Sequence, residues 1–269
     1  MSKYSERRFL RVSAFAKASS LLAILLFLHS CKTEKTTENY SLTKATASQT
    51  TIDESLGSVD SIEQFIAPYK KNLSAQMDSV LSYNPKLMHK NDYELNTPIG
   101  NFFAETVRVQ ADPVFKSRTG KSFDMALLNH GGIRAALPQG QITMRNAYEI
   151  MPFENQIVVA ELDGSQMNRL VNYLVERERA HPFEGLKIAL DKNGKLKSAL
   201  IKGEPINSQH TYYVATTDYL FNGGDNMSFF EGAKMTDLDY KLRNAIIDYL
   251  RKTDTLNFEH DDRFTKSTL

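Results

Sequence analysis

Two short loops carry residue types that could recognise a small polar ligand. One is "NHGGIR", from Asn129 to Arg134, and the other is "NGGDN", from Asn222 to Asn226. Each follows an apolar run typical of a strand. Paired glycines let a ligand approach the backbone and leave amide donors uncovered, an arginine suits a phosphate, and Asp225 suits a hydroxyl. A Gly-Gly pair after a strand is more often an ordinary turn, so neither loop alone defines a site.

Two aromatic residues stand beside turns in the same part of the chain. Phe153 lies in "MPFEN", and Tyr219 precedes the second glycine pair. Aromatic side chains at such positions are often core residues, and this alternative stays open for each taken alone. Combined with the two loops, they indicate a ligand that carries a flat ring and polar groups.

No pattern in the chain indicates catalysis. The six histidines are isolated, without the spacing of metal ligands, and no Gly-x-Ser-x-Gly segment offers a nucleophilic serine. The only cysteine is Cys31. We therefore expect no catalytic residue, no metal site and no cofactor in this chain. His130, the one histidine in a candidate loop, is interpreted as a residue that lines the pocket or donates a hydrogen bond.

The N-terminus has the features of a bacterial secretory signal. Five basic residues between Lys3 and Lys17 precede the apolar run 21–28, which is too short for a stable membrane span. "LHSC" then resembles the cleavage and lipidation site of lipoproteins. We expect residues 1–30 to be removed and Cys31 to be lipidated, which anchors the protein in the cell envelope on the periplasmic or outer-membrane side. The alternative is an incidental cysteine in a cleaved leader.

The charge of the remaining chain argues against nucleic acid as a partner. Removal of residues 1–30 takes away five basic side chains and one acidic side chain, which leaves 28 basic and 31 acidic residues and a formal charge of about −3. No run rich in lysine and arginine remains. A groove for a polyanion is therefore not expected.

The chain after the signal divides into a tether, a domain and a tail. Residues 31–58 are rich in Thr, Ser, Lys and Glu without an apolar period, which predicts a flexible tether. From Asp60, with Glu63 as its capping partner, an apolar stripe predicts a helix that Pro85 ends, and residues 266–269 form the tail. The stripe is expected in the core, with a partner-binding groove as the alternative. It consists of Ile62, Phe65, Ile66, Tyr69, Leu73, Met77, Val80 and Leu81.

Helices and strands alternate over residues 59–265 and predict one α/β domain. Helices are expected after "TPIGNFF" through Val107, over Ser165 to about Arg179 and over Leu238–Leu250, and "TMRNAYEIM" predicts a short helix or a turn. Strands are expected in "FDMALL", "QIVVAELDG" and "TYYVATTDYL", and "LKIALDKNGKLKSALI" predicts a hairpin that turns at Asn193-Gly194.

Several of these segments, in this order, resemble the C-terminal, substrate-binding domain of the 5′-nucleotidase family. They are "TPIGNFFAETV", "LLNHGGIRAALPQGQIT", "NAYEIMPFENQIVVAELDGSQM", "FEGLKIALD", "YYVATTDYLFNGGDN" and "HDDRF". The resemblance covers about residues 59–265. It implies an α/β fold, a four-layer α-β-β-α sandwich.

The resemblance also implies which residues bind the substrate, a nucleotide. Asn129 and Arg134 match the pair that contacts the phosphate side, and Phe153 and Tyr219 match the two aromatics that stack on the base. Asp225 matches the residue that holds the ribose hydroxyls. The complete implied substrate-binding set is Asn129, Arg134, Phe153, Gly185, Tyr219, Gly223 and Asp225.

The sequence departs from the family pattern at three places. His130 stands where the family usually has glycine, and Asn226 replaces the glycine after Asp225. A further phosphate-binding arginine of the family, upstream of the Gly-Asn pair, has no counterpart, since Tyr93 lies roughly there with Lys90 nearby. These departures bear mainly on the phosphate side of the site.

In the family, hydrolysis belongs to an N-terminal metallophosphoesterase domain with two metal ions, and its motifs are absent from this sequence. One hypothesis is therefore a split 5′-nucleotidase in nucleotide catabolism, in which this chain recognises the nucleotide and a separate metallophosphoesterase chain supplies the divalent metal pair. A second hypothesis is a lipoprotein that captures nucleosides or nucleotides without hydrolysis. A third is a structural lipoprotein that kept the fold and lost the pocket.

Overall fold

The computed structural model describes residues 42, 44–53 and 55–267. The predicted signal sequence and the lipidation site Cys31 lie outside the described residues. The chain divides into two units, Met1–Gly57 and Ser58–Leu269. Over the described part of the first unit, which belongs to the predicted tether, the residues are exposed and form no helix or strand. Among the described helices, none has both the length and the apolar character needed to cross a membrane.

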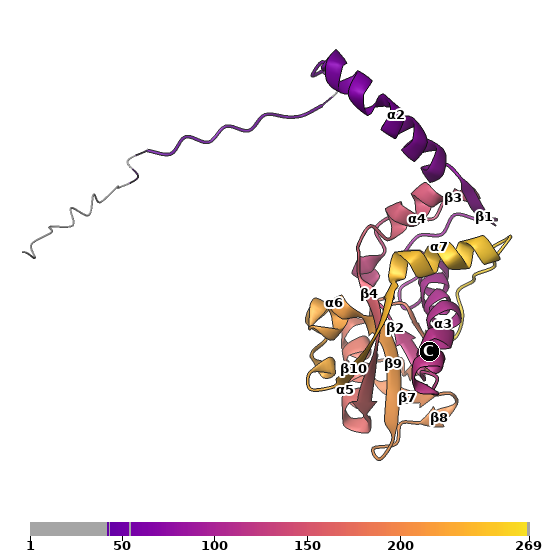
Figure 1. The fold of residues 1–269 in the computed structure, drawn as a ribbon. Helices are drawn as coiled ribbons and strands as arrows, with labels where there is room; N and C mark the ends of the chain where they lie inside the picture. Colours follow the sequence, from indigo (N-terminus) through magenta and orange to yellow (C-terminus); the bar gives the residue numbers. More distant parts are fainter. Residues whose placement is uncertain (1–41, 43, 54, 268–269) are drawn as a thin grey trace, which may run out of the picture. The chain divides into compact units, whose positions relative to one another are not determined.

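A five-stranded mixed sheet forms the centre of the second unit (Figure 1). Its strand order is β10-β4-β9-β2-β5, and β2 and β9 are parallel while the other neighbours are antiparallel. The strands are β2 (Met125–Leu127), β4 (Gln156–Asp163), β5 (Phe183–Glu184), β9 (Thr211–Thr217) and β10 (Lys234–Lys241).

Both faces of this sheet are buried, which explains its nearly continuous apolar strands. Alternate residues along a strand point to opposite faces. Val159 and Ala215 face one hydrophobic core, and their neighbours Ala160 and Val214 face the other. Two cores on one sheet require a covering layer on each side.

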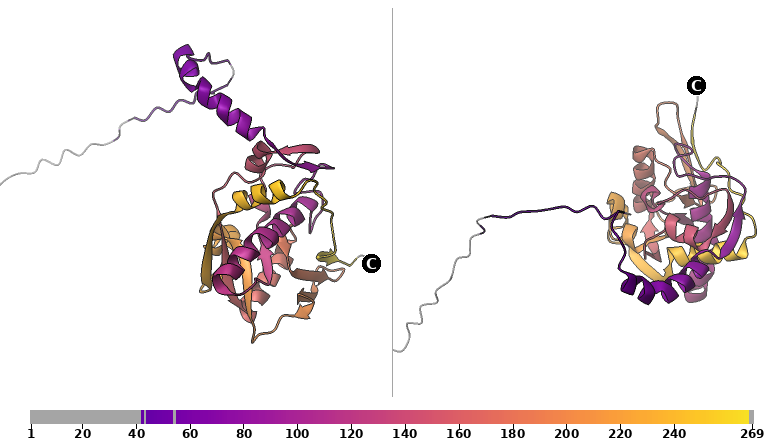
Figure 2. Two further views of the ribbon diagram at one scale, coloured as in Figure 1. Left: turned by 45° about the vertical axis from the view of Figure 1, so that its right-hand side comes forward. Right: turned by 90° about the horizontal axis from the view of Figure 1, so that it is seen from above.

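Helices α3 (Pro98–Thr119) and α7 (Leu242–Lys252) cover the first face, and Figures 1 and 2 show α7 lying across α3. Thr97 and Pro98 define the start of α3. The Thr97 hydroxyl accepts a hydrogen bond from the Gly100 N–H, and Pro98 occupies the first turn. The short helix α4 (Met144–Ile150) adds Ile150 to the same core.

Helix α5 (Gly164–Arg177) and a second sheet cover the other face. A capping box between Asp163 and Gln166 starts α5, and its predicted inward residues are buried. The second sheet has the order β11-β6-β7-β8, and its central pair is the predicted hairpin about Asn193-Gly194. Its strands are β6 (Leu186–Leu190), β7 (Leu196–Ile201), β8 (Glu204–Pro205) and β11 (Phe264–Lys266). The predicted α/β sandwich of helices and two sheets is confirmed.

Helix α2 (Asp60–Met77) is shorter than predicted. It ends before Pro85 because Val80 and Leu81 belong to strand β1 (Val80–Asn84). This strand pairs with β3 (Gly140–Thr143) in a separate two-stranded sheet. Strand pairing therefore overrides the helical spacing of the last two apolar residues.

The predicted burial of α2 is also wrong. No residue of α2 is buried, and Phe65 and Tyr69 are 72% and 69% exposed. The predicted capping box is absent, because Val59 is the N-cap and Asp60 already lies in the first turn. Helices α3 and α7 already cover this face of the central sheet. The apolar stripe of α2 therefore has no core against which to pack.

Two further boundaries differ near the C-terminus. The strand predicted through Leu220 ends at Thr217, whose hydroxyl caps the short helix α6 (Asp218–Phe221). The last helix begins at Leu242 rather than Leu238 because Leu238 belongs to β10, a strand that was not predicted from the sequence. The alternation in "KMTDLDYK" was the available signal.

A buried polar contact fixes the loop after β2. The His130 N–H, in the 3₁₀ turn η1 (His130–Gly132), donates to Nδ1 of His181, 3.4 Å away. His181 is 4% exposed, and burial lowers its pKa to about 4. Since Nδ1 accepts this hydrogen bond, the neutral imidazole is the form that the fold requires.

The strand connection at Gly185 gives a first prediction. Gly185 has φ +84°, and a Cβ there would lie 2.3 Å from the Asp124 carbonyl oxygen. We expect Gly185→Ala to lower the free energy of unfolding by about 2–4 kcal/mol, measured by urea denaturation. The control is Gly203→Ala, because Gly203 has φ +88° with no atom within 4 Å of such a Cβ. A cost no larger than that of the control would contradict the steric argument.

Acid sensitivity gives a second prediction. In the unfolded chain His181 titrates near 6.5, whereas in the folded chain it stays neutral to about pH 4. Between these values only the unfolded state takes up the proton, so the free energy of unfolding falls as the pH falls, by at most about 1.4 kcal/mol per pH unit. His130, whose pKa is lowered mainly by burial, adds to the same slope.

We expect His181→Gln to remove part of this slope between pH 6.5 and 4, measured by urea denaturation at several pH values. His210→Gln is the matched control, because His210 is exposed. An unchanged slope in the His181 variant would show that other groups cause the acid sensitivity.

Candidate functional site

Three chain segments meet at one edge of the central sheet. Strands β2 and β9 are parallel neighbours, so their carboxyl ends, and the loops after them, lie at the same edge. Strand β4 runs antiparallel to β9, with Ile157 opposite Thr217, so the segment before β4 arrives at that edge too. The topology therefore brings both glycine loops and the Phe153 segment together.

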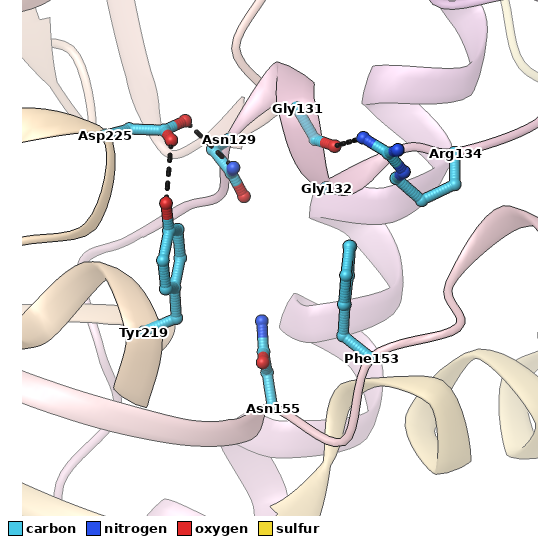
Figure 3. A pocket seen from close by; sticks show the side chains of 8 residues that line it. All are labelled: Asn129, Gly131, Gly132, Arg134, Phe153, Asn155, Tyr219 and Asp225. Carbon is cyan, nitrogen blue, oxygen red and sulfur yellow. Dashed lines mark hydrogen bonds between the residues drawn. The ribbon is translucent and has the colours of Figure 1, made fainter. Parts of the chain in front are cut away.

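These segments enclose a cavity of about 300 Å³, shown in Figure 3. This volume is at the lower end of the range for small-molecule sites. The lining residues are Asn129, Gly131, Gly132, Arg134, Phe153, Asn155, Tyr219 and Asp225.

Asp225 links the two glycine loops. Its Oδ2 accepts a hydrogen bond from Asn129 Nδ2 (2.9 Å), and its Oδ1 accepts one from the Tyr219 hydroxyl (3.1 Å). The Tyr173 hydroxyl donates to the backbone oxygen of Asp225 (2.9 Å) and holds the loop from behind. Each carboxylate oxygen keeps a lone pair for a ligand hydroxyl.

Gly224 makes room for Tyr219. A Cβ at Gly224 would lie 2.5 Å from Cε1 of the Tyr219 ring, so a side chain there would displace the ring. Gly223, the predicted site residue, does not line the cavity; it has φ +90° and turns the chain into the 3₁₀ turn η2 (Gly224–Asn226). Asp225 and Asn226 both adopt positive φ in that turn, which aspartate and asparagine tolerate well.

Phe153 lies across the cavity from Tyr219, with Asn155 between them (Figure 3). Both rings are partly open, with exposures of 40% and 46%. Arg243 of α7 braces the Phe153 segment, because its Nη1 donates to the carbonyl oxygens of Pro152 (3.0 Å) and Phe153 (3.2 Å). Helix α7 thus fixes the Phe153 segment, and both rings keep exposed surface that a ligand can contact.

The phosphate-side residues lie on the first glycine loop. Arg134 is exposed, and its guanidinium lies 5.7 Å from the centre of the Phe153 ring and donates to the Gly131 carbonyl (3.4 Å). Asn129 is 8% exposed and folds back over the glycines, where a Cβ on Gly132 would lie 2.8 Å from its Oδ1. The loop therefore presents the positive charge of Arg134, with the Asn129 amide packed against its glycines.

The structure gathers five of the seven predicted site residues at this cavity: Asn129, Arg134, Phe153, Tyr219 and Asp225. Gly223 and Gly185 lie outside its lining, and Gly185 packs against the Asp124 backbone.

Of the two roles considered for His130, the structure shows the hydrogen-bond donor, and one residue of the cavity was not predicted. His130 does not line this cavity but donates from Nε2 to the Lys90 carbonyl and Asn91 Oδ1. The Tyr93 ring stacks on the His260 ring, with 4.4 Å between the two ring centroids. Asn155 lines the cavity and was not predicted, although its place two residues after Phe153 in "MPFEN" was a usable signal.

No group of three or more His, Cys, Asp or Glu side chains with the arrangement of a metal site occurs among the described residues. The cavity itself contains one carboxylate, Asp225, beside amides, aromatic rings and Arg134. Such a lining can bind and orient a ligand through stacking, hydrogen bonds and charge.

Comparisons with known proteins agree with these observations. The family model "5′-nucleotidase, C-terminal domain" matches residues 76–232. The protein UshA of Escherichia coli K12 is 34% identical over 114 residues, which cover 40% of this chain and 20% of UshA. The cell wall protein Lmo0130 of Listeria monocytogenes is 29% identical over 168 residues, which cover 57% of this chain and 21% of Lmo0130. The chain thus spans about a fifth of each relative's length.

Among solved structures, the 5′-nucleotidase precursor of Thermus thermophilus has the same fold, with a TM-score of 0.63 and 22% identity. The match covers 76% of this chain and 42% of that one. The family match extends over more than half of the chain and includes every residue that lines the cavity. The chain therefore belongs to the 5′-nucleotidase C-terminal domain family.

Proposed function

We propose that the cavity binds a nucleotide, with the base between Phe153 and Tyr219, the ribose hydroxyls at Asp225 and the phosphate beside Arg134 and Asn129. The observation that carries this proposal is the pair of partly open aromatic rings on opposite sides of a cavity that also holds one carboxylate and one guanidinium. Each group matches one chemical part of a nucleotide.

The expected energies are sufficient for binding. Base stacking on an aromatic side chain is worth about 1–3 kcal/mol per base. A hydrogen bond to a charged group adds about 1.5–3 kcal/mol. Preformed hydrogen bonds from Asn129 and Tyr219 already orient Asp225, which reduces the entropy lost on binding.

The proposal extends to a split 5′-nucleotidase, in which this chain recognises the nucleotide and a separate metallophosphoesterase chain with a divalent metal pair hydrolyses it. The family membership supports the hydrolytic context of this proposal. Because the cavity offers aromatic rings, amides, a carboxylate and a guanidinium for a ligand, non-catalytic capture of nucleosides or nucleotides is the second candidate.

We also propose a location in the bacterial cell envelope, through a lipid anchor on Cys31. The basic and apolar residues before "LHSC" support it. The similarity to a protein described as a cell wall protein supports a location outside the cytoplasm.

Nucleotide binding gives a third prediction. We expect the chain from Lys32 onward to bind AMP in isothermal titration calorimetry, and Phe153→Ala to weaken binding by about 5- to 150-fold, because one stacking face is lost. Phe65→Ala is the matched control, since Phe65 is an exposed phenylalanine of α2. Equal affinities of the two variants would refute the stacking role, and no AMP binding by the parent chain would refute the proposed function.

Hydrolysis gives a fourth prediction. With Mn²⁺ or Zn²⁺, we expect phosphate release from AMP only when a metallophosphoesterase encoded in the same operon is added, because this chain supplies recognition and the other supplies metal. Arg134→Ala in the mixture is expected to abolish the release. If the chain binds AMP but the mixture releases no phosphate, the capture hypothesis is supported and the split-enzyme hypothesis is refuted.

A further inference from the structure

A second cation lies on the same glycine loop as Arg134. The ammonium of Lys90 donates to the Ile133 carbonyl oxygen at 2.9 Å, and the guanidinium of Arg134 donates to the Gly131 carbonyl oxygen at 3.4 Å. Two positive charges are therefore attached to carbonyls of one short loop. Neither the charge of Lys90 nor its position follows from the motif "NHGGIR".

Two independent contacts place Lys90 there. Met88 and Leu137 exchange both backbone hydrogen bonds (3.0 and 2.9 Å), which lays the segment before Lys90 along the segment after the glycine loop. Beyond this bridge, His130 Nε2 lies 3.1 Å from the Lys90 carbonyl oxygen and 3.0 Å from Asn91 Oδ1. Both partners are oxygens, so Nε2 carries the proton and donates to them.

The cations near the loop form no close ion pair with a described carboxylate. Among the described residues, no carboxylate oxygen lies within 4.0 Å of the charged nitrogens of Lys90, Arg134 or Arg179. The pKa of Lys90 is lowered, first by partial burial and then by the charges of Arg134 and Arg179. Mutual repulsion of this kind is relieved when an anion binds between the cations.

The acidic groups that line the hollow around Lys90, and Asp225 in the cavity beside Arg134, have other partners or are exposed. The hollow of about 400 Å³ that contains Lys90 and Arg179 is also lined by Asp92, Glu94 and Glu178. Asp92 accepts a hydrogen bond from the His89 N–H, and Glu178 pairs with Lys266. Lys90 keeps two ammonium hydrogens and Arg134 keeps four N–H groups for a ligand.

We propose that Lys90 and Arg134 together form the anion site for the phosphoryl group of the nucleotide, and that His130 is the positioning residue that holds Lys90 in place. The inference rests on the proposed function and identifies what distinguishes a nucleotide from a nucleoside at this cavity. It also joins two unusual features of the sequence, since the histidine in the glycine loop positions the lysine on the neighbouring segment.

The test compares ligands with and without a phosphoryl group. AMP, adenosine and inorganic phosphate are titrated calorimetrically against the chain from Lys32 onward and against Lys90→Gln, Lys90→Arg and Lys192→Gln. Lys90→Gln is expected to weaken AMP and phosphate binding by about tenfold or more and to leave adenosine within twofold, because one charge-assisted contact is lost. Lys90→Arg keeps the charge and is expected to stay within about threefold. Lys192 lies in an exposed turn, so its variant removes one charge without touching the loop.

A structural role for Lys90 alone would weaken AMP and adenosine equally, and that result would overturn the proposal, as would no effect of Lys90→Gln on AMP. If the parent chain binds phosphate in a Lys90-dependent way but binds neither AMP nor adenosine, the proposed function fails and the anion site stands. If it binds AMP with no dependence on Lys90, the anion site fails and the proposed function stands. If it binds none of the three ligands, both fail.

A double-mutant cycle tests the positioning role. His130→Ala is expected to weaken AMP binding several-fold without changing adenosine, and to have little further effect once Lys90→Gln is present, because both changes remove the same contact. His130→Gln keeps an N–H donor and is expected to restore part of the loss. Additive effects of the two variants would show that His130 does not act through Lys90. Circular dichroism of each variant verifies that the fold is retained.

Discussion

The hydrogen bond between Asn129 and Asp225 is the interaction on which the site depends. It is possible because β2 and β9 are parallel neighbours whose following loops emerge at the same edge of the sheet. The antiparallel strand β4 brings the Phe153 segment to this edge. Strand direction therefore brings the site segments together, and helices α5 and α7 then fix two of them through Tyr173 and Arg243.

Much of the site could be predicted from the sequence, because the relevant signals are local. Buried strands followed by glycine pairs are visible in "FDMALLNHGG" and "VATTDYLFNGG", and five of the seven predicted residues line the cavity. Gly223 and Gly185 are different, since glycine serves either close approach or positive φ, and the sequence does not distinguish these uses. Gly224, next to Gly223, is the glycine that provides space for Tyr219.

The errors have a common physical origin in long-range packing. The apolar stripe of α2 has good helical spacing, but spacing cannot show whether a core face remains for it to cover. Strand β10 is the outermost strand on one side of the central sheet, and its several charged residues give it the composition of a loop. Lys90 reaches the carbonyl of Ile133 on the glycine loop with the help of the bridge between Met88 and Leu137 and of His130, contacts that join distant parts of the sequence.

The separation of the site residues along the chain has a consequence for folding. Asn129 and Asp225 are 96 residues apart, and the cavity lies where three strands meet. Because the pocket requires β2, β4 and β9 to have paired, and loop closure over such a distance costs entropy, we expect it to form late in folding. A ligand of this cavity therefore binds only the folded state, and its binding free energy stabilises the whole sheet against unfolding.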